Sequence, residues 1–382
     1  MIRLSRTIVS ALALAGFAAL SACVSVPERP DIAASQQASA RIPGYGQIRL
    51  WEDAEAPEWR AWRDRMLAER LGRGPTGQFE MLAISSGSDK GAFSAGFLNG
   101  WSEKGTRPRF DIVSGVSTGA LIAPFAFLGE DYDPQLRDLY TTINAKMIYH
   151  TTALKGILGG TSLANTEPLA QLIESYADEA LIDAVAREDK LGRRLLVQTT
   201  NLDAERGVVW DMGAIAASDN PGRYRLFRQV LLASASIPGF FPPALIDVEG
   251  EGFAFAELHV DGGTTSSVVA IPPAVLFAKE RDVERMRGRI TVLYNGALRP
   301  VYRVTEPSVF SILERALTTS LKTADQRSLA ELARFSDESG LTLNVNSVGP
   351  EAEDPDAELF DQEYMQGLFE LGRERAMAAA RE

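Results

Sequence analysis

The feature that most constrains this chain is an alternation of strand-like and helix-like segments that begins near residue 79. Short apolar runs alternate with stretches in which apolar residues recur every three to four positions. The strand-like runs cover residues 79–85, 110–114, 195–200, 208–211, 253–260, 290–294 and 341–345. The helix-like stretches cover residues 92–104, 118–128, 168–177, 224–233, 307–335 and 356–379. This order predicts the α/β class, with a mostly parallel central sheet and helices on both of its faces.

The segments flanking this pattern predict how the chain is divided. We see no internal repeat and no second linker after residue 78, so we expect one domain over residues 78–380. Residues 24–46 are rich in Ala, Ser, Gln and Pro and have no hydrophobic period, which predicts a flexible tether. The pattern predicts a helix that begins near Pro57, and its mixed charges favour packing on the domain over lying on a membrane. Residues 23–77 therefore join the start of the mature chain to the domain.

The first 22 residues have the character of a secretory signal. Arg3 and Arg6 precede an apolar run over residues 7–20, which is too short to cross a bilayer as a helix. The run ends in the tetrapeptide Leu20-Ser21-Ala22-Cys23, and small residues at this point are typical of a cleavage site. We expect residues 1–22 to be removed.

The tetrapeptide resembles a bacterial lipobox, in which the cysteine is lipidated and becomes the new N-terminus. Cys23 is the only cysteine of the chain, which strengthens the resemblance. Acyl chains on Cys23 would hold the protein on a membrane. Position 24 is Val rather than the Asp that resembles an inner-membrane retention signal, so we expect the outer membrane of a bacterial envelope, facing the periplasm.

Charge and composition exclude several classes of function. The 382 residues include 39 Lys and Arg against 51 Asp and Glu, a net charge of −12, so the chain lacks the basic surface that nucleic-acid binding needs. Two histidines and one cysteine leave little material for a metal site. An acidic body is repelled by anionic lipid, so a covalent anchor must supply membrane residence. We predict no metal, no cofactor and no nucleic-acid partner, and the sequence indicates no particular protein partner.

A Gly-x-Ser-x-Gly motif, Gly115-Val116-Ser117-Thr118-Gly119, joins the predicted strand 110–114 to the predicted helix 118–128. A nucleophilic serine gains from a tight strand-to-helix turn, since its hydroxyl then projects clear of the sheet. Small residues two positions before and after it avoid collisions in this strained backbone, and Gly115 and Gly119 meet that need. The motif predicts Ser117 as a nucleophile.

Small residues also fill the loop Ser85-Ser86-Gly87-Ser88-Asp89-Lys90-Gly91-Ala92, which opens the first predicted helix of the domain. Such a loop leaves N–H groups clustered and unpaired, which suits a phosphate or the oxyanion of acyl transfer. Ser86 and Ser88 replace the first two glycines of a dinucleotide-binding fingerprint, and Lys90 precedes Gly91 where a P-loop lysine would follow a glycine. An oxyanion loop and a plain tight turn both remain open.

A third segment, His259-Val260-Asp261-Gly262-Gly263, ends the predicted strand 253–260. Open α/β sheets place their sites at the carboxyl ends of strands, although Asp-Gly is also a common turn dipeptide. A serine nucleophile needs a base within hydrogen-bond reach. His259 and Asp261 share one face of the strand, so each is a candidate base for Ser117.

In this order the three segments resemble the patatin-like phospholipase family. The family pairs a glycine-rich oxyanion loop, a Gly-x-Ser-x-Gly serine and an Asp-Gly-Gly or Asp-Gly-Ala aspartate, and residues 233–243 are also similar to one of its segments. The resemblance implies a patatin-like three-layer sandwich and an acyl hydrolase acting on membrane lipid. It implies a Ser–Asp dyad, with Ser117 as nucleophile and Asp261 as general base. The oxyanion donors would lie among Gly87, Ser88, Asp89, Lys90 and Gly91.

The sequence departs from the family pattern in the oxyanion loop. The usual triple glycine is replaced by Ser86-Gly87-Ser88, and the acidic Asp89 follows. A carboxylate close to an anionic intermediate opposes catalysis unless Lys90 neutralises it. Two alternatives to the dyad hydrolase stay open, the first because of these departures and the second because His259 shares a strand face with Asp261. One is a catalytically silent lipoprotein that binds lipid or a partner, and the other is a Ser–His–Asp esterase that uses His259.

Overall fold

The computed structural model describes residues 29–71, 79–151, 162, 164–269, 288–354 and 357–379. The predicted signal peptide, residues 1–22, and the predicted lipidation site, Cys23, lie outside the described residues. Among the helices that are described, none has both the length and the apolar character needed to cross a membrane.

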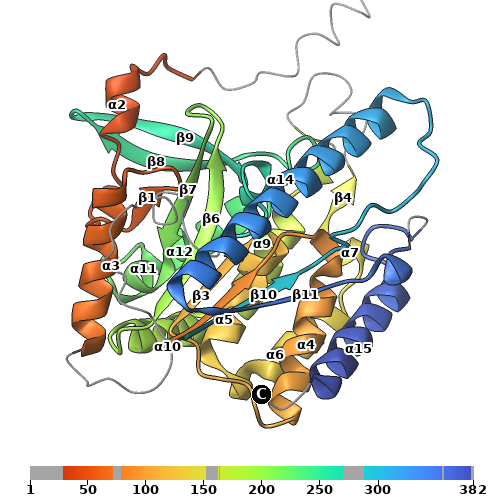
Figure 1. Ribbon diagram of the computed structural model, residues 1–382. Helices are drawn as coiled ribbons and strands as arrows, with labels where there is room; N and C mark the ends of the chain where they lie inside the picture. Colours follow the sequence, from red (N-terminus) through yellow and green to blue (C-terminus); the bar gives the residue numbers. More distant parts are fainter. Residues whose placement is uncertain are drawn as a thin grey trace, which may run out of the picture.

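In the described part of the chain, nine strands form one mixed sheet through the centre of the molecule (Figure 1). Its main path runs through β1 (Arg49–Trp51), β7 (Arg206–Asp211), β6 (Arg194–Asn201), β3 (Ile112–Val116), β2 (Phe79–Ile84), β10 (Gly288–Tyr294) and β11 (Thr342–Ser347). From β6 to β11 every pair is parallel, whereas β7 and β1 add antiparallel pairs at the other side. The antiparallel hairpin of β8 (Ala244–Gly250) and β9 (Phe253–Asp261) joins through β9 to β6. A pair of two-residue strands, β4 (His150–Thr151) and β5 (Ala164–Asn165), lies outside this sheet.

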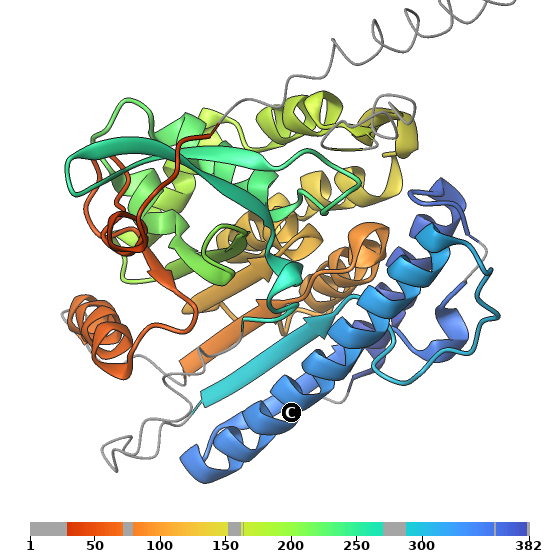
Figure 2. The ribbon, with the colours of Figure 1, turned by 90° about the horizontal axis from the view of Figure 1, so that it is seen from above.

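Helices cover both faces of the sheet, because its central strands are apolar on both sides. In β2, Leu82 and Ile84 belong to one buried cluster, while Met81 and Ala83 belong to the other. The larger cluster packs beneath α4 (Gly91–Glu103), α5 (Thr118–Leu128), α6 (Asp133–Thr141), α9 (Glu167–Tyr176), α10 (Glu179–Asp189), α11 (Met212–Ala217), α12 (Arg223–Ser234) and α15 (Gln362–Ala378). The smaller one packs beneath α3 (Ala56–Leu71) and α14 (Val309–Ser339), which lie together on one side of the sheet in Figure 2. The predicted α/β three-layer sandwich with a mostly parallel sheet is confirmed.

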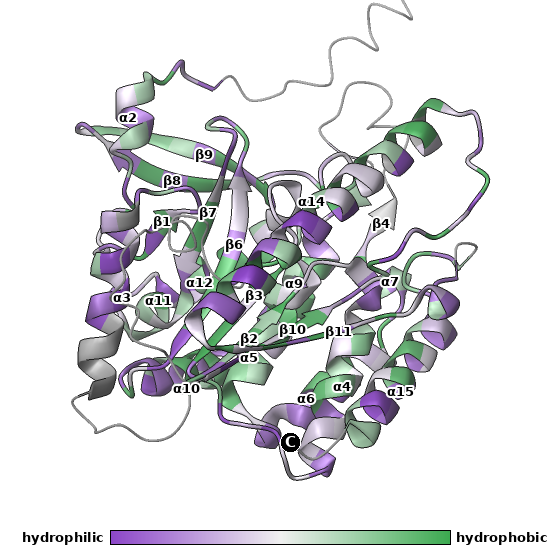
Figure 3. Ribbon diagram, in the orientation of Figure 1, coloured by the Kyte–Doolittle hydropathy of each residue, from purple (hydrophilic) through white to green (hydrophobic). Residues whose placement is uncertain are grey.

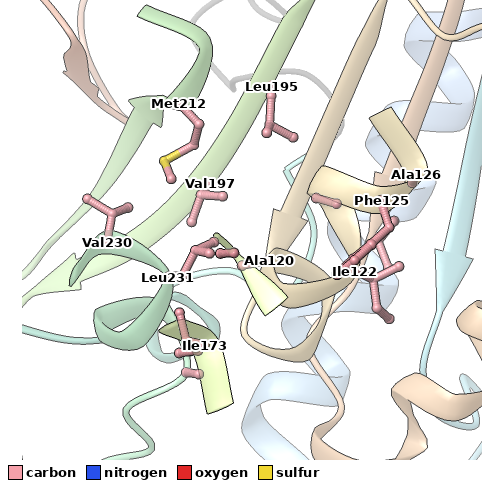
Figure 4. Close-up of a cluster of buried hydrophobic side chains, with 14 of the residues drawn as sticks. Ala120, Ile122, Phe125, Ala126, Ile173, Leu195, Val197, Met212, Val230 and Leu231 are labelled. Atoms are coloured by element: carbon pink, nitrogen blue, oxygen red, sulfur yellow. The ribbon is translucent and has the colours of Figure 1, made fainter. Parts of the chain in front are cut away.

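Side chains from two helices and one strand meet in the larger cluster (Figure 4). Ala120 of α5 lies beside Val197 of β6 and Leu231 of α12. All three are at most 2% exposed. This packing fixes α5, and therefore the turn that precedes it, against β6.

Residues 29–46 differ from the flexible tether predicted for them. The guanidinium of Arg29 donates to both carboxylate oxygens of Asp203 at 2.7 and 2.5 Å. A short helix, α2 (Ala34–Ala38), follows, and Arg41 forms an antiparallel bridge with Glu249 of β8. The tether prediction is wrong here because a chain can dock on an exposed sheet edge through backbone hydrogen bonds, which require no hydrophobic period.

The helix predicted to begin near Pro57 is α3, and it packs on the domain as expected. Trp59 is 2% exposed and belongs to the smaller buried cluster. Trp62 donates from its indole nitrogen to Asp211 at 3.2 Å. Together with β1, this helix places part of the chain before residue 78 inside the folded unit.

Candidate active site

The carboxyl ends of β3 and β9 meet beside β6. Parallel pairing of β3 with β6 ends where Val116 lies opposite Gln198. At the next residue of β6, Thr199, the partner is Asp261, the last residue of the antiparallel strand β9. Because β3 and β9 approach this point from opposite directions, the turns that follow them come together. The structure thereby brings Ser117 and Asp261, 144 residues apart in the chain, into one site.

Ser117 occupies the sharp turn between β3 and α5. Its backbone has φ 57° and ψ −122°, a conformation that a residue with a side chain rarely adopts. The turn is possible because the backbone comes very close to its surroundings at both flanking glycines. A Cβ atom on Gly115 would lie 2.2 Å from the carbonyl oxygen of Gly119, and one on Gly119 would lie 2.3 Å from that of Ile84. Both glycines of the motif are therefore sterically required.

The hydroxyl of Ser117 donates a hydrogen bond to Oδ2 of Asp261 at 2.5 Å. The other carboxylate oxygen, Oδ1, accepts from the N–H of Gly263 at 2.7 Å, which fixes the orientation of the carboxylate. Both side chains are buried, with residue exposures of 4% for Ser117 and 6% for Asp261. Burial raises the pKa of Asp261 to about 6, although the hydrogen bonds from Ser117 and Gly263 oppose the rise. The predicted nucleophile and the predicted base are in contact.

Two serines of the 233–243 segment accept hydrogen bonds from the backbone N–H groups of Ser117 and Asp261. The Oγ of Ser234 accepts from the N–H of Ser117 at 3.0 Å and donates to the carbonyl of Gln198 at 2.7 Å. The carbonyl of Ser236 accepts from the N–H of Asp261 at 2.9 Å. The sequence singled out this segment only through its family resemblance, since neither serine has a spacing that signals a role.

The loop from Ser86 to Gly91 packs against the turns that carry Ser117 and Asp261. A Cβ atom on Gly91 would lie 2.2 Å from Oγ1 of Thr118, and one on Gly263 would lie 3.3 Å from Ser86. Gly87 has φ 152° and Ser88 has φ 56°, so two consecutive residues have positive φ. In the described part of the chain, no hydrogen-bond acceptor is present for the N–H groups of Gly87 and Ser88. These two amides are free to bind an oxyanion.

A largely apolar pocket opens beside Ser117 and Ser88. Its walls come from α5, α6, α9, α15 and the segment after α12, and they include Leu121, Leu139, Ile143, Ile148, Leu169, Leu172, Ile237, Phe241, Phe360 and Met365. Phe241 thus lines the pocket, whereas Phe240 packs edge-on against Phe241 and against Tyr149, with both pairs of ring centroids 4.9 Å apart. A pocket of this character suits a hydrocarbon chain.

Among the described residues, Lys90 forms its direct ion pair with Glu353 and not with Asp89. The Asp89 carboxylate accepts from the N–H of Phe360 at 3.0 Å, and burial raises its pKa. It lines a second pocket, together with Lys90 and Glu353, rather than the apolar pocket beside Ser117. Asp89 therefore ties the loop to the segment before α15.

His259 is not placed to act on Ser117. The residue is fully buried, and its Nδ1 is hydrogen bonded to Thr199 Oγ1 at 2.8 Å. Its Nε2 lies 2.9 Å from Glu257, which also pairs with Arg49. Burial lowers the pKa of His259. Both ring nitrogens are occupied by groups other than Ser117, so the geometry does not support the Ser–His–Asp alternative.

One known protein family matches the part of the chain that holds this site. A family model described as patatin-like phospholipase matches residues 82–274, just over half of the chain, and this range contains Ser117, Asp261 and the 86–91 loop. Among solved structures, VipD from Legionella pneumophila is similar at 12% sequence identity with a TM-score of 0.38. The similarity covers 79% of this chain and 66% of VipD, so the chain spans just under two thirds of that protein. No curated protein matches the chain. The extent of the family match shows that this chain belongs to the patatin-like phospholipase family.

Proposed function

We propose that the protein hydrolyses carboxylic ester bonds of membrane lipid with a Ser117–Asp261 dyad. The observation that carries the proposal is the 2.5 Å hydrogen bond from Ser117 to Asp261 inside a buried site. The apolar pocket beside Ser117 would hold the acyl chain of the substrate. Membership of a lipid hydrolase family supports the same substrate class.

In the first half of the reaction, Oγ of Ser117 attacks the ester carbonyl carbon as its proton moves to Asp261. The negative charge that develops on the carbonyl oxygen is met by the N–H groups of Gly87 and Ser88. Each well-placed donor of this kind contributes about 3 kcal/mol to transition-state stabilisation. Asp261 then gives its proton to the departing alcohol, and an acyl-serine remains.

In the second half, a water molecule attacks the acyl-serine and passes a proton to Asp261. Collapse of the intermediate returns that proton to Oγ of Ser117 and releases the fatty acid. The dyad needs no free alkoxide, because the proton leaves the serine only as the bond to carbon forms. The hydrogen bond from the Gly263 amide keeps the Asp261 carboxylate oriented towards Ser117 in both halves of the reaction.

Labelling with a fluorophosphonate probe and measurement of fatty-acid release from phospholipid vesicles test the proposal together. We expect Ser117→Ala to abolish labelling and to lower hydrolysis by about 10³-fold or more. Ser175→Ala, at an exposed position of α9, is the matched control and should behave as wild type. Labelling of the Ser117→Ala protein as strong as that of wild type would exclude this nucleophile. Absence of any turnover by the wild type would favour the silent lipoprotein.

We also propose that the protein is anchored by lipid on Cys23 in the outer membrane of a bacterial envelope, facing the periplasm. The lipobox-like sequence and the absence of any other cysteine support this. Mass spectrometry of the N-terminal peptide should find Cys23 acylated and residues 1–22 absent. An N-terminal peptide that begins at another residue, or that carries Cys23 without an acyl chain, would contradict the anchor.

A further inference from the structure

Six exposed apolar side chains gather at the N-terminal end of α14 and in the segment before it. Two of them, Tyr302 and Val304, lie in the segment before the helix and are 89% and 78% exposed. The others, on α14, are Val309, Ile312, Leu313 and Leu317, between 49% and 77% exposed. We call these six residues the α14 patch; Figure 3 shows the hydrophobic colour at this end of the helix. In the other half of α14, Leu329 and Leu332 are buried against the sheet, so the helix extends beyond the layer that it covers.

The position of α14 is fixed by hydrogen bonds to the chain that precedes it. Three side chains on one face of the helix, seven and four residues apart, each donate to a carbonyl oxygen of that chain. Their bonds are Arg315 to Val301 at 2.7 Å, Lys322 to Arg299 at 3.4 Å and Gln326 to Leu298 at 2.5 Å. Residues 298–301 therefore run alongside the helix, and Tyr302 and Val304 follow them in the chain.

The α14 patch and Ser117 lie at the same edge of the sheet. Because α14 connects β10 to the parallel strand β11, the helix begins at the carboxyl edge, where Ser117 follows β3. Arg29 is held at this edge too, since its partner Asp203 lies in the turn after β6. In Figure 1 the start of the described chain and the N-terminal end of α14 are both at the top of the molecule. Arg29 is six positions after Cys23, a stretch that spans at most about 20 Å, so a lipid on Cys23 would hold this edge towards the membrane.

The charges around the patch also suit a membrane surface. Residues 298–323 contain four Lys and Arg (Arg299, Arg303, Arg315 and Lys322) and two acids, Glu306 and Glu314, although the whole chain has a net charge of −12. Arg315 and Lys322 bind carbonyl oxygens of the preceding chain. Their charge nevertheless makes this stretch less repelled by anionic lipid than the rest of the acidic chain. The local excess of positive charge therefore offsets the repulsion expected for the acidic body.

We infer that the α14 patch docks the protein on a lipid bilayer and brings the Ser117 pocket to the membrane surface. The inference rests on the proposed function and anchor for its biological consequence, but the docking itself can be measured without catalysis. The occupant is the bilayer, because the proposed anchor places a membrane at this edge. A second copy of the chain is a competing occupant that the experiment must detect.

The direct test uses the full chain as processed in a bacterial membrane, purified and mixed with phosphatidylcholine vesicles that contain phosphatidylglycerol. A polarity-sensitive dye is attached at Leu313→Cys, and a nitroxide on the lipid tail is the quencher. Leu191→Cys is the matched control, since Leu191 is 42% exposed but precedes β6 at the opposite edge of the sheet. Any signal from dye on Cys23 is measured with the labelled wild-type chain and subtracted.

We expect emission from the dye at 313 to fall about twofold or more with quenching lipid, and emission at 191 to stay unchanged. Equal quenching at both positions would overturn the inference. So would a dimer in solution that Leu313→Asp converts to a monomer while quenching at 313 is absent, since a second copy would then cover the patch.

Activity supplies a second measurement that separates docking from catalysis. Leu313→Asp should lower hydrolysis of vesicle lipid about tenfold and leave hydrolysis of a water-soluble short-chain ester within about twofold of wild type. Leu191→Asp should leave both rates unchanged. An equal loss on both substrates would contradict docking through this face. If the wild type cleaves neither substrate, the proposed function fails, and the quenching result alone decides whether the patch binds membranes.

Discussion

Asp261 accepts the hydrogen bond of Ser117 in a site so buried that the pKa of the carboxyl group rises to about 6. The same burial that brings the base into contact with the nucleophile therefore opposes ionisation of the base. A carboxylate that titrates near neutrality is a stronger general base than an ordinary aspartate, since proton affinity rises with pKa. The relationship links the activity of the site to its pH dependence and to the stability of the fold.

The first prediction concerns the pH profile of ester hydrolysis. The dyad requires ionised Asp261, so kcat/KM should be constant at neutral pH, fall to half near pH 6 and decline tenfold for each further pH unit. The profile should be measured with a soluble ester whose own charge does not change over pH 4–8. A midpoint near 4, where an unperturbed aspartate titrates, would contradict the assignment of Asp261 as base.

The second prediction is that Asp261→Asn stabilises the fold while it abolishes activity. A carboxyl whose folded pKa exceeds its unfolded pKa holds more protons when folded, so stability falls as pH rises from about 4 to about 6. Above pH 6 the ionised group costs roughly 3 kcal/mol, as an order of magnitude. Asn cannot ionise and fits the same space.

Urea unfolding at pH 8 and pH 4 measures this effect. The Asp261→Asn protein should gain up to about 3 kcal/mol at pH 8 and little at pH 4. Asp203→Asn is the control and should lower the free energy of unfolding at pH 8, because the hydrogen bond from Arg29 lowers the pKa of Asp203. A loss of stability at pH 8 for Asp261→Asn would show that its hydrogen bonds outweigh the cost of burial.

The third prediction concerns Ser88, which stands where the family has glycine. Its φ of 56° costs a residue with a side chain about 1 kcal/mol, and its buried Oγ has no hydrogen-bond partner among the described residues. Ser88→Gly should therefore raise the free energy of unfolding by about 1 kcal/mol. If the oxyanion donor is the backbone N–H, kcat should stay within about tenfold of wild type.

Kinetics with one soluble ester and unfolding curves for the same preparation check this substitution. Gly87→Ala is the contrasting variant, since its added Cβ would lie 2.3 Å from the carbonyl oxygen of Asn295, and it should lose both stability and activity. A fall in kcat of about 100-fold or more for Ser88→Gly would instead assign the oxyanion contact to the Ser88 hydroxyl.

The sequence predicted the central elements of the fold because their signals are strong and local. The predicted segments 79–85, 195–200 and 290–294 lie within one residue or two of β2, β6 and β10, whose apolar runs are buried on both faces. The hairpin strand β8 was missed although Ile246 and Val248 are buried between exposed neighbours. Two buried apolar positions in a seven-residue edge strand are a weak signal against the surrounding Pro and Gly. The docking of residues 29–46 could not be predicted, since it depends on a partner edge far away in the chain.

The residues of the site also differ in whether a local sequence signal predicts them or whether they depend on tertiary contacts. Ser117 and its two glycines could be predicted because a strained turn has few sequence solutions. The sequence could not show whether Asp261 or His259 is the base for Ser117, because both lie on the same face of one strand. It depends on where β9 ends beside β6 and on Thr199 and Glu257 binding the imidazole, and both are tertiary facts. The role of Asp89 was also hidden, because its partner, the amide of Phe360, is 271 residues away.

The last prediction separates structure from catalysis at His259. Replacing the residue with Ala removes the contacts of the imidazole with Thr199 and Glu257 in the core, which should cost about 1–3 kcal/mol of stability. Activity per folded molecule should change only a few-fold, because the imidazole does not contact the dyad. Titration with a fluorophosphonate probe counts the competent sites, so kcat can be expressed per labelled molecule. If His259 served as the base, both the rate of labelling and the kcat of the folded variant would instead fall by about 10³-fold.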